Sequence, residues 1–169
     1  MQPRFIEKPA MFLVGFNFFG DPFRFSSDWS EENEIGRLWK RFMAYLTSHP
    51  GKIKHVKQDL ISYEMHIQHE ETPLTGEFEV FAGIEVELLE EIPIEMVVKI
   101  LPATTYAVFT FKGTEITSDW SKVIYEEGIS TSGYQSAYPY NLQAYDDRFK
   151  GLEHIDESIL DVYVPVKKS

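Results

Sequence analysis

The sequence contains no cysteine, which excludes disulfide bonds, thiolate metal sites and a cysteine nucleophile, and which fits a cytoplasmic location. Basic residues are also scarce, because 16 Lys and Arg stand against 27 Asp and Glu and the formal net charge is −11. An acidic surface repels phosphate backbones, so we expect no direct contact with nucleic acid. Without a run of about 18 apolar residues or a basic, apolar leader, the sequence predicts neither a membrane span nor a signal peptide.

The residues that are present are typical of one globular domain, since 43% are apolar and 15% are aromatic. Apolar residues recur at helical spacing over 31–48, and they alternate with glutamates over 78–90. The alternation predicts a half-buried strand whose glutamate-bearing face meets solvent. The first half predicts a strand at 5–19, a loop at 23–32 and a helix at about 31–48. Two further strands are predicted at 60–67 and 78–90.

The second half predicts the same order of elements. It begins with a strand pair or one bent strand interrupted at Pro102, and continues with a helix and two strands. These segments lie at 96–113, 115–129, 140–148 and 157–167. Pro165 predicts that the last strand lies at an edge of the sheet or ends there, because proline has no backbone N–H for a ladder.

Short matching segments indicate that the two halves are copies of one unit. "LISYE" at 60–64 matches "LQAYD" at 142–146, and each follows a tryptophan, Trp39 or Trp120, at almost the same distance. "FEVFAGIEVE" likewise aligns with "SILDVYVPVK". We therefore predict an α+β fold in which two βαββ modules, at about 3–90 and 95–168 of a single domain, are related by a pseudo-twofold axis. This fold has an antiparallel sheet, two main helices and a central ligand groove where the modules meet.

The residues expected to line this groove are those that the repeat brings near its axis, or that share a strand face with them. Gln143 lies two residues from Tyr145 on a strand, so both side chains point to one face. Alternatives stay open at three points: the tryptophans could only anchor helices to the sheet, Gln143 could face solvent, and Phe81 could pack on a loop. The candidate ligand-binding residues are Trp39, Tyr63, Phe81, Trp120, Gln143 and Tyr145.

Several of these segments resemble a known family. "YAVFTFKG", "IYEEGISTSGY", "NLQAYDDRF" and "ILDVYVPVK" look like the second half of the GyrI-like small-molecule-binding domain, and "FEVFAGIEV" matches its first half. This domain is the effector-binding domain of many AraC-type and MerR-type transcription activators. The resemblance covers nearly the whole chain and implies two βαββ modules around a groove that binds hydrophobic, often cationic, aromatic compounds. It implies no cofactor.

The resemblance also implies a role for one carboxylate, and the sequence departs from the family there. In many relatives a Glu at the bottom of the pocket neutralises the ligand, and the matching position in this chain is Gln143, beside Tyr145. An amide offers hydrogen bonds without a neutralising charge. We therefore expect a weaker preference for cations, and Gln143→Glu is expected to strengthen it.

Two other functions stay open. Some stand-alone relatives resemble hydrolases that use a groove carboxylate, which would require Glu79, Glu85 or Asp146 to reach the groove, because Glu64 should point away from Tyr63. Others resemble acidic modulators of DNA gyrase, which would imply a protein partner.

Other site types have little support. His66 and His69 lie at the end of a predicted strand and face opposite sides, so no metal site is expected. Two modules account for the whole chain, so we expect no DNA-binding module and a monomer.

Overall fold

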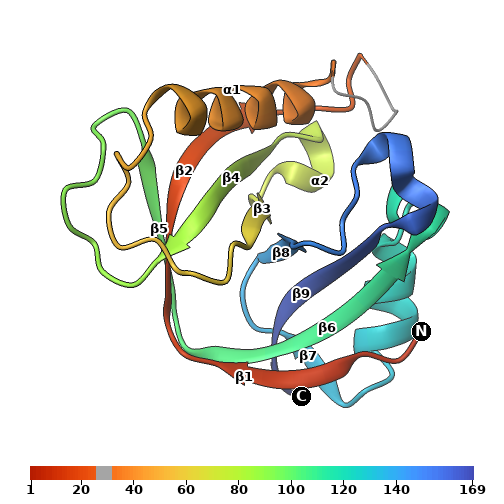
Figure 1. The fold of residues 1–169 in the computed structure, drawn as a ribbon. Coiled ribbons are helices and arrows are strands. Elements are labelled where there is room, and N and C mark those ends of the chain that lie inside the picture. Colours follow the sequence, from red (N-terminus) through yellow and green to blue (C-terminus); the bar gives the residue numbers. More distant parts are fainter. Residues whose placement is uncertain (26–31) are drawn as a thin grey trace.

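In a computed structural model, which describes residues 1–25 and 32–169, the chain folds as α+β around one nine-stranded sheet (Figure 1). Neighbouring strands are antiparallel in the order β1-β6-β9-β8-β3-β4-β2-β5, and β7 pairs with β9 beside that path. The predicted fold class is confirmed. Of the loop predicted at 23–32, residues 26–31 lie outside the described residues. The strands are β1 Arg4–Lys8, β2 Met11–Gly20, β3 Ser62–Ile67, β4 Phe78–Val86, β5 Val97–Leu101, β6 Thr104–Lys112, β7 Tyr134–Ser136, β8 Tyr140–Tyr145 and β9 Ile159–Lys168.

The helical segments are short except for α1, which lies across β2 and β4 (Figure 1). Asn33 caps α1, because its side-chain oxygen accepts the backbone N–H of Gly36 at 2.8 Å. Leu38 and Phe42 are the buried residues of the helix face that contacts the sheet. The segments are α1 Glu34–Ser48, α2 Thr72–Thr75, the 3-10 helices η1 Gly113–Thr117 and η3 Leu152–Glu157, and the π-helix η2 Lys122–Ile129.

The second predicted helix, at 115–129, is wrong in form, because the structure divides it into η1 and η2. Between them the carboxylate of Asp119 accepts the backbone N–H of Ser121 at 3.1 Å, a local turn that competes with helix. η2 is wound more widely than an α-helix, and the N–H of Ser130 donates to the carbonyl of Tyr125 at 3.2 Å.

The two halves of the sheet are interlocked by their first strands. The strand predicted over 5–19 is in fact two, and β1 pairs with β6 of the second half while β2 pairs with β4 and β5. β5 in turn precedes β6 in the chain but joins the first half of the sheet. β3 and β8 meet at the centre, where the two halves join.

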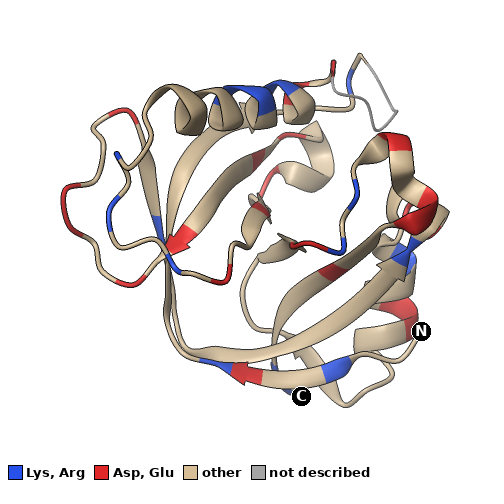
Figure 2. Ribbon diagram, viewed as in Figure 1, with Lys and Arg blue, Asp and Glu red and all other residues tan. Residues whose placement is uncertain are grey.

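Apolar residues fill both faces of this sheet. On the face that carries the helices, one cluster lies under α1 around Phe42 and another lies beside η2 around Phe109. A third cluster lies on the opposite face and draws on both halves, from Met11, Tyr63 and Phe81 to Tyr106 and Leu142. Charged residues lie largely in loops, at strand ends and on outer helix faces (Figure 2).

Two strand predictions are corrected by this packing. β4 lies between β2 and β3 and is covered on both faces, so the face expected to meet solvent carries Phe81, which is fully buried. β9 is an interior strand rather than an edge, since it pairs with β6 and β8. Pro165 is tolerated because it lies in a gap between two partner strands. The pairing of β9 with β8 ends at Tyr163 and its pairing with β7 starts at Val166, so neither strand needs an N–H from Pro165.

The backbones of β2 and β4 approach closely at Gly15 and Gly83, which face each other across the two strands. A Cβ at position 15 would lie 2.0 Å from the carbonyl oxygen of Ala82. We expect Gly15→Ala to lower the free energy of unfolding by about 2 kcal/mol, as overpacking does. Chemical denaturation measures this, with Gly20→Ala as the matched control because nothing lies within 4 Å of its Cβ. Equal effects of the two substitutions would contradict the prediction.

Candidate functional site

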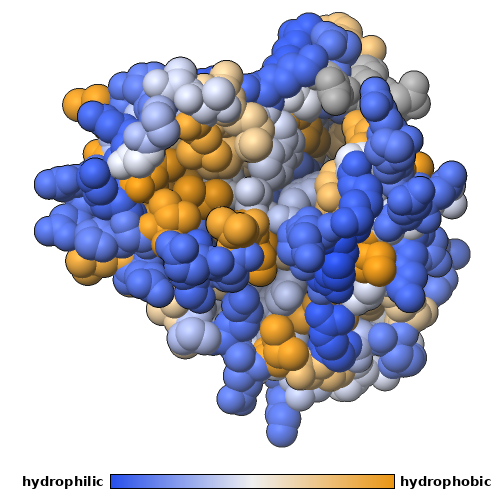
Figure 3. Space-filling model, viewed as in Figure 1, coloured by the Kyte–Doolittle hydropathy of each residue, from blue (hydrophilic) through white to orange (hydrophobic). Residues whose placement is uncertain are grey.

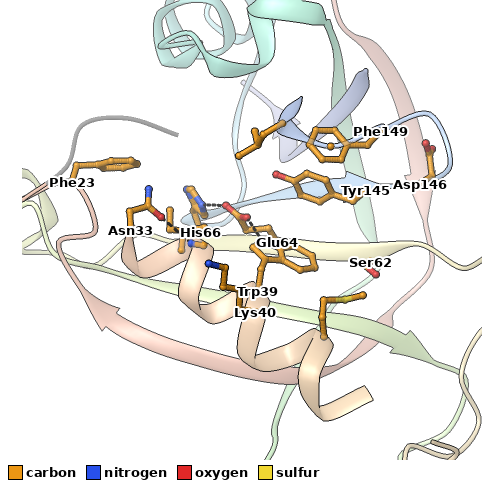
Figure 4. A pocket seen from close by; sticks show the side chains of 15 residues that line it. Phe23, Asn33, Trp39, Lys40, Ser62, Glu64, His66, Tyr145, Asp146 and Phe149 are labelled. Carbon is orange, nitrogen blue, oxygen red and sulfur yellow. Dashed lines mark hydrogen bonds and ion pairs between the residues drawn. The ribbon is translucent and has the colours of Figure 1, made fainter. Parts of the chain in front are cut away.

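A cavity of about 490 Å³ opens between α1, β3 and β8 (Figure 3). α1 forms one wall, and the segment from the end of β8 to η3 forms the opposite wall (Figure 4). β3 and β8 pair beneath it, with Glu64 directly opposite Gln143. The described residues that line the cavity are Phe23, Asn33, Ile35, Gly36, Trp39, Lys40, Met43, Ser62, Glu64, His66, Tyr145, Asp146, Phe149, Gly151 and Leu152.

Glu64 is the polar centre of the cavity floor. The indole Nε1–H of Trp39 donates to Glu64 Oε2 at 2.6 Å, and Nε2 of His66 lies 2.7 Å from Glu64 Oε1 (Figure 4). The side chain of Glu64 is only 2% exposed. An ionised carboxylate only accepts hydrogen bonds, so Nε2 of His66 carries the proton that points to it. A buried negative charge is therefore held by two N–H donors from different elements.

Gln143 and Tyr145 share one face of β8 and lie beside the Glu64–His66 pair. The hydroxyl of Tyr145 donates to Gln143 Oε1 at 2.8 Å, and Gln143 Nε2 lies 3.4 Å from His66 Nε2. Gln143 is fully buried, so it supports the floor from below rather than lining it. Burial raises the pKa of Tyr145 well above its ordinary value, and the charge of Glu64 raises it further. The Tyr145 hydroxyl is therefore a donor at neutral pH.

Aromatic rings form the sides of the cavity. The ring of Tyr145 meets that of Trp39 edge-on at 5.2 Å and that of Phe149 at 4.8 Å. Phe23 lies across the opening from Phe149 (Figure 4). Such an arrangement presents ring faces and edges to a flat or branched aromatic ligand.

Ion pairs connect the rim of the cavity to the first strand. Asp146, a lining residue, binds Arg148 Nη2 at 2.7 Å, and the same nitrogen lies 2.8 Å from Asp161 on β9. Asp161 also accepts from Arg4 of β1 at 2.9 Å and from the hydroxyl of Thr110 at 2.5 Å. β1, β6 and β9 are thus joined to the rim through one buried carboxylate.

Two of the predicted pocket residues lie on the opposite face of the sheet. Tyr63 and Phe81 are buried in the apolar cluster there, with exposures of 2% and 0%. Tyr63 pairs with Ala144, whereas Tyr145 pairs with Ser62. The alignment of "LISYE" with "LQAYD" is therefore one residue out of step with the structure. A shift of one residue along a strand moves a side chain to the other face of the sheet.

Trp120 is not part of the cavity wall either. It packs on Phe111, with ring centroids 5.7 Å apart, in the cluster beside η2. Its buried indole nitrogen has no hydrogen-bond partner among the described residues. The cavity is therefore asymmetric: α1 contributes Trp39, and the second half contributes Tyr145 rather than its tryptophan.

Sequence analysis missed Glu64 and His66. Glu64 was correctly expected to point away from Tyr63, but the cavity lies on the side to which Glu64 points. Position 143 carries no charge, as expected, but a carboxylate stands directly opposite it on β3, that of Glu64. The signal was present as Ser62, Glu64 and His66, three polar residues on one face of a strand that is otherwise apolar.

Within the described residues, no group of three or more acidic or histidine side chains could hold a metal ion. No helix in the described part of the chain is long and apolar enough to cross a membrane.

Comparison with known proteins agrees with the fold. Residues 4–166 match the model of the integron-associated effector binding protein family. The chain belongs to this family. As the sequence motifs predicted, it is a GyrI-like effector-binding domain. The transcriptional regulator BrlR of Pseudomonas aeruginosa strain PAO1 is 32% identical over 168 residues, which make up 98% of this chain and 56% of BrlR. The chain thus spans just over half the length of this relative.

Solved structures of low identity share the fold. SAV2435 bound to tetraphenylphosphonium has a TM-score of 0.70 at 16% identity, over 99% of this chain and 94% of its own. An integron cassette protein of Vibrio cholerae has a TM-score of 0.59 at 18% identity, over 97% and 95%.

Proposed function

We propose that this effector-binding domain holds one hydrophobic, aromatic cation in the cavity between α1, β3 and β8. The observation that carries the proposal is Glu64, a buried carboxylate beneath a cavity whose sides are the rings of Trp39, Tyr145 and Phe149. Ring faces attract a delocalised cation, and the carboxylate supplies the opposite charge in a region that water reaches poorly.

The size of the cavity and one structural relative support this proposal. About 490 Å³ lies within the range of 300 to about 1,000 Å³ that small-molecule pockets occupy. Tetraphenylphosphonium, with which SAV2435 was solved, is a compound of the proposed class. For this chain it is a probe, and the natural ligand is defined only by its chemistry.

Further expectations from the sequence stay proposals. We propose that residues 1–169 act as a single domain with repeats at about 3–90 and 95–168, as a cytoplasmic monomer whose partner is a small molecule rather than nucleic acid. The order of elements supports the repeats, because β2, α1, β3 and β4 are followed by β6, η1, η2, β8 and β9.

Hydrolysis is the second candidate function, favoured by the Glu64–His66 contact, since a carboxylate beside an imidazole can move a proton. Both oxygens of Glu64 already accept N–H groups, however, and Asp146 is held by Arg148. Neither carboxylate has an oxygen set aside for an attacking water. Ligand binding therefore accounts for the geometry more completely.

Titration with tetraphenylphosphonium tests the proposed function. We expect saturable quenching of tryptophan fluorescence, since Trp39 lines the cavity, and a melting temperature that rises with ligand concentration. Phe149→Ala should weaken binding about tenfold, because it removes one wall. Phe5→Ala is the matched control, since that ring also contacts a tyrosine ring, that of Tyr134, but lies at the far edge of the sheet. Equal binding by both variants, or no saturation, would contradict the cavity assignment.

A further inference from the structure

Besides the neutral hydroxyl of Tyr145, four charged or imidazole side chains of the described lining decide the electrostatics of the cavity, and two of these four are held by partners at its rim. Lys40 forms an ion pair with Glu32 at 2.9 Å, and Asp146 is held by Arg148. The other two are Glu64 and His66, which lie two residues apart on β3 and face the cavity together. The net charge of the cavity floor therefore depends on this pair.

The Glu64–His66 pair has two states with different net charge. Nε2 of His66 carries a hydrogen toward Glu64 whether the imidazole is neutral or protonated, so the 2.7 Å contact suits both states. With a neutral imidazole the pair carries one negative charge, and with an imidazolium it carries none. Imidazole is the side chain that commonly changes its charge between pH 5 and 8.

We infer that His66 decides whether the cavity accepts a cation, because a proton on its ring competes with the ligand for the charge of Glu64. This inference rests on the proposed function of the same cavity. A ligand cation that enters above the pair meets a net negative charge only when His66 is neutral. Linkage requires the reverse effect as well, so a bound cation must expel the proton from His66. His66 therefore sets the choice between cationic and neutral ligands as a function of pH.

The groups that face His66 from neighbouring elements do not reverse this effect. From β4 its ring meets the neutral ring of Phe78, at 5.2 Å, and from β8 it meets the neutral amide of Gln143. Burial raises the pKa of Tyr145, so its hydroxyl stays neutral.

The carboxylates and the lysine around the cavity also keep their charge in this range. Hydrogen bonds from Arg148 lower the pKa of Asp146, so that carboxylate stays charged well below neutral pH. On α1, Lys40 remains paired with Glu32, and hydrogen bonding to Lys40 lowers the pKa of that carboxyl. The charged groups around the Glu64–His66 pair are thus held by partners outside it.

The test measures the affinity of two probes between pH 5.5 and 8. Tetraphenylphosphonium carries a permanent charge, so any dependence of its binding on pH must come from the protein. Triphenylphosphine oxide is a neutral compound with similar rings. We expect the dissociation constant of the cation to fall about tenfold or more as the pH rises, and that of the neutral probe to change less than twofold. Calorimetry in buffers of different ionisation enthalpy should show proton release when the cation binds below pH 7.

His66→Gln is the decisive variant, because its amide can still donate to Glu64 but carries no titratable proton. Its affinity for the cation should be high and nearly independent of pH, whereas His154→Gln, at an exposed histidine, should behave as the wild type. A histidine NMR titration should also show His66 losing its proton at lower pH when the cation is bound.

A pH-independent affinity of the wild type, or a dependence that persists in His66→Gln, would overturn the inference and leave the proposed function standing. Failure of both probes to bind at any pH would overturn the proposed function, and this inference with it.

Discussion

Glu64→Gln is expected to weaken the binding of tetraphenylphosphonium by about 10- to 100-fold at pH 7.5. The reason is that an opposite charge within about 4 to 6 Å changes the free energy of a charged group by roughly 1 to 3 kcal/mol in a partly buried site. Triphenylphosphine oxide should bind within about twofold of the wild type, since it carries no net charge. Fluorescence or calorimetric titration of both probes measures the ratio, and a thermal melt confirms that the variant is folded.

Gln143 allows a sharper control, because it stands directly opposite Glu64 in the β3–β8 register. The double variant Glu64→Gln, Gln143→Glu moves the carboxylate to the neighbouring strand and should restore part of the preference for the cation. Gln143→Glu alone should not strengthen it, because two adjacent buried carboxylates share a proton. Glu153→Gln removes an exposed charge and should change neither probe. An equal loss of both probes in Glu64→Gln would assign Glu64 a purely structural role.

Asp161→Asn is expected to lower the free energy of unfolding by about 3 kcal/mol. The carboxylate is 2% exposed and accepts from Arg4, Arg148 and Thr110, so its loss leaves two guanidinium groups without their shared partner. Breaking a buried ion pair costs about 3 to 5 kcal/mol, and the lower end applies because both arginines are partly exposed. Urea denaturation measures the change, and Asp147→Asn is the control at an exposed position.

The effect of Asp161→Asn should depend on pH in one direction. Burial alone would raise the pKa of Asp161, but hydrogen bonds from Arg148, Thr110 and Arg4 outweigh it, and the pKa is lowered. A carboxyl whose pKa is lowered on folding stabilises the fold above its unfolded pKa of about 3.9, and that stability is lost as the pH falls through the folded value. The difference between wild type and variant should thus be constant from pH 5 to 7 and shrink below pH 4. A difference that grows on acidification would contradict the assignment.

The α-helix and most of the strands were predictable because their signals are local. Helical spacing of apolar residues and a break at Pro50 located α1, and the structure moves only its first residue, to Glu34 behind the cap of Asn33. The π-helix was not predictable in the same way. In η2, a Cβ at Gly128 would lie 2.5 Å from the ring of Phe109, a contact with β6 that no local pattern reveals.

The candidate site was predicted in part. Trp39 and Tyr145 line the cavity and Gln143 lies beneath it, but Tyr63, Phe81 and Trp120 do not line it. Sequence similarity paired Tyr63 with Tyr145, and a shift of one residue along a strand places a side chain on the other face. No local pattern reveals such a shift when both faces of the sheet are buried.

The sequence by itself determined the α+β class and the repeated order of elements, because these follow from the periodicity of apolar residues. Its short motifs indicated the family, and its composition showed that the chain is acidic and rich in aromatic residues. Only the tertiary structure decided which face of β3 looks into the cavity, and with it that Glu64 and His66 lie there. The reason is that strand parity sorts side chains into two sets, while the packing of α1 and of the opposite apolar cluster decides which set is enclosed.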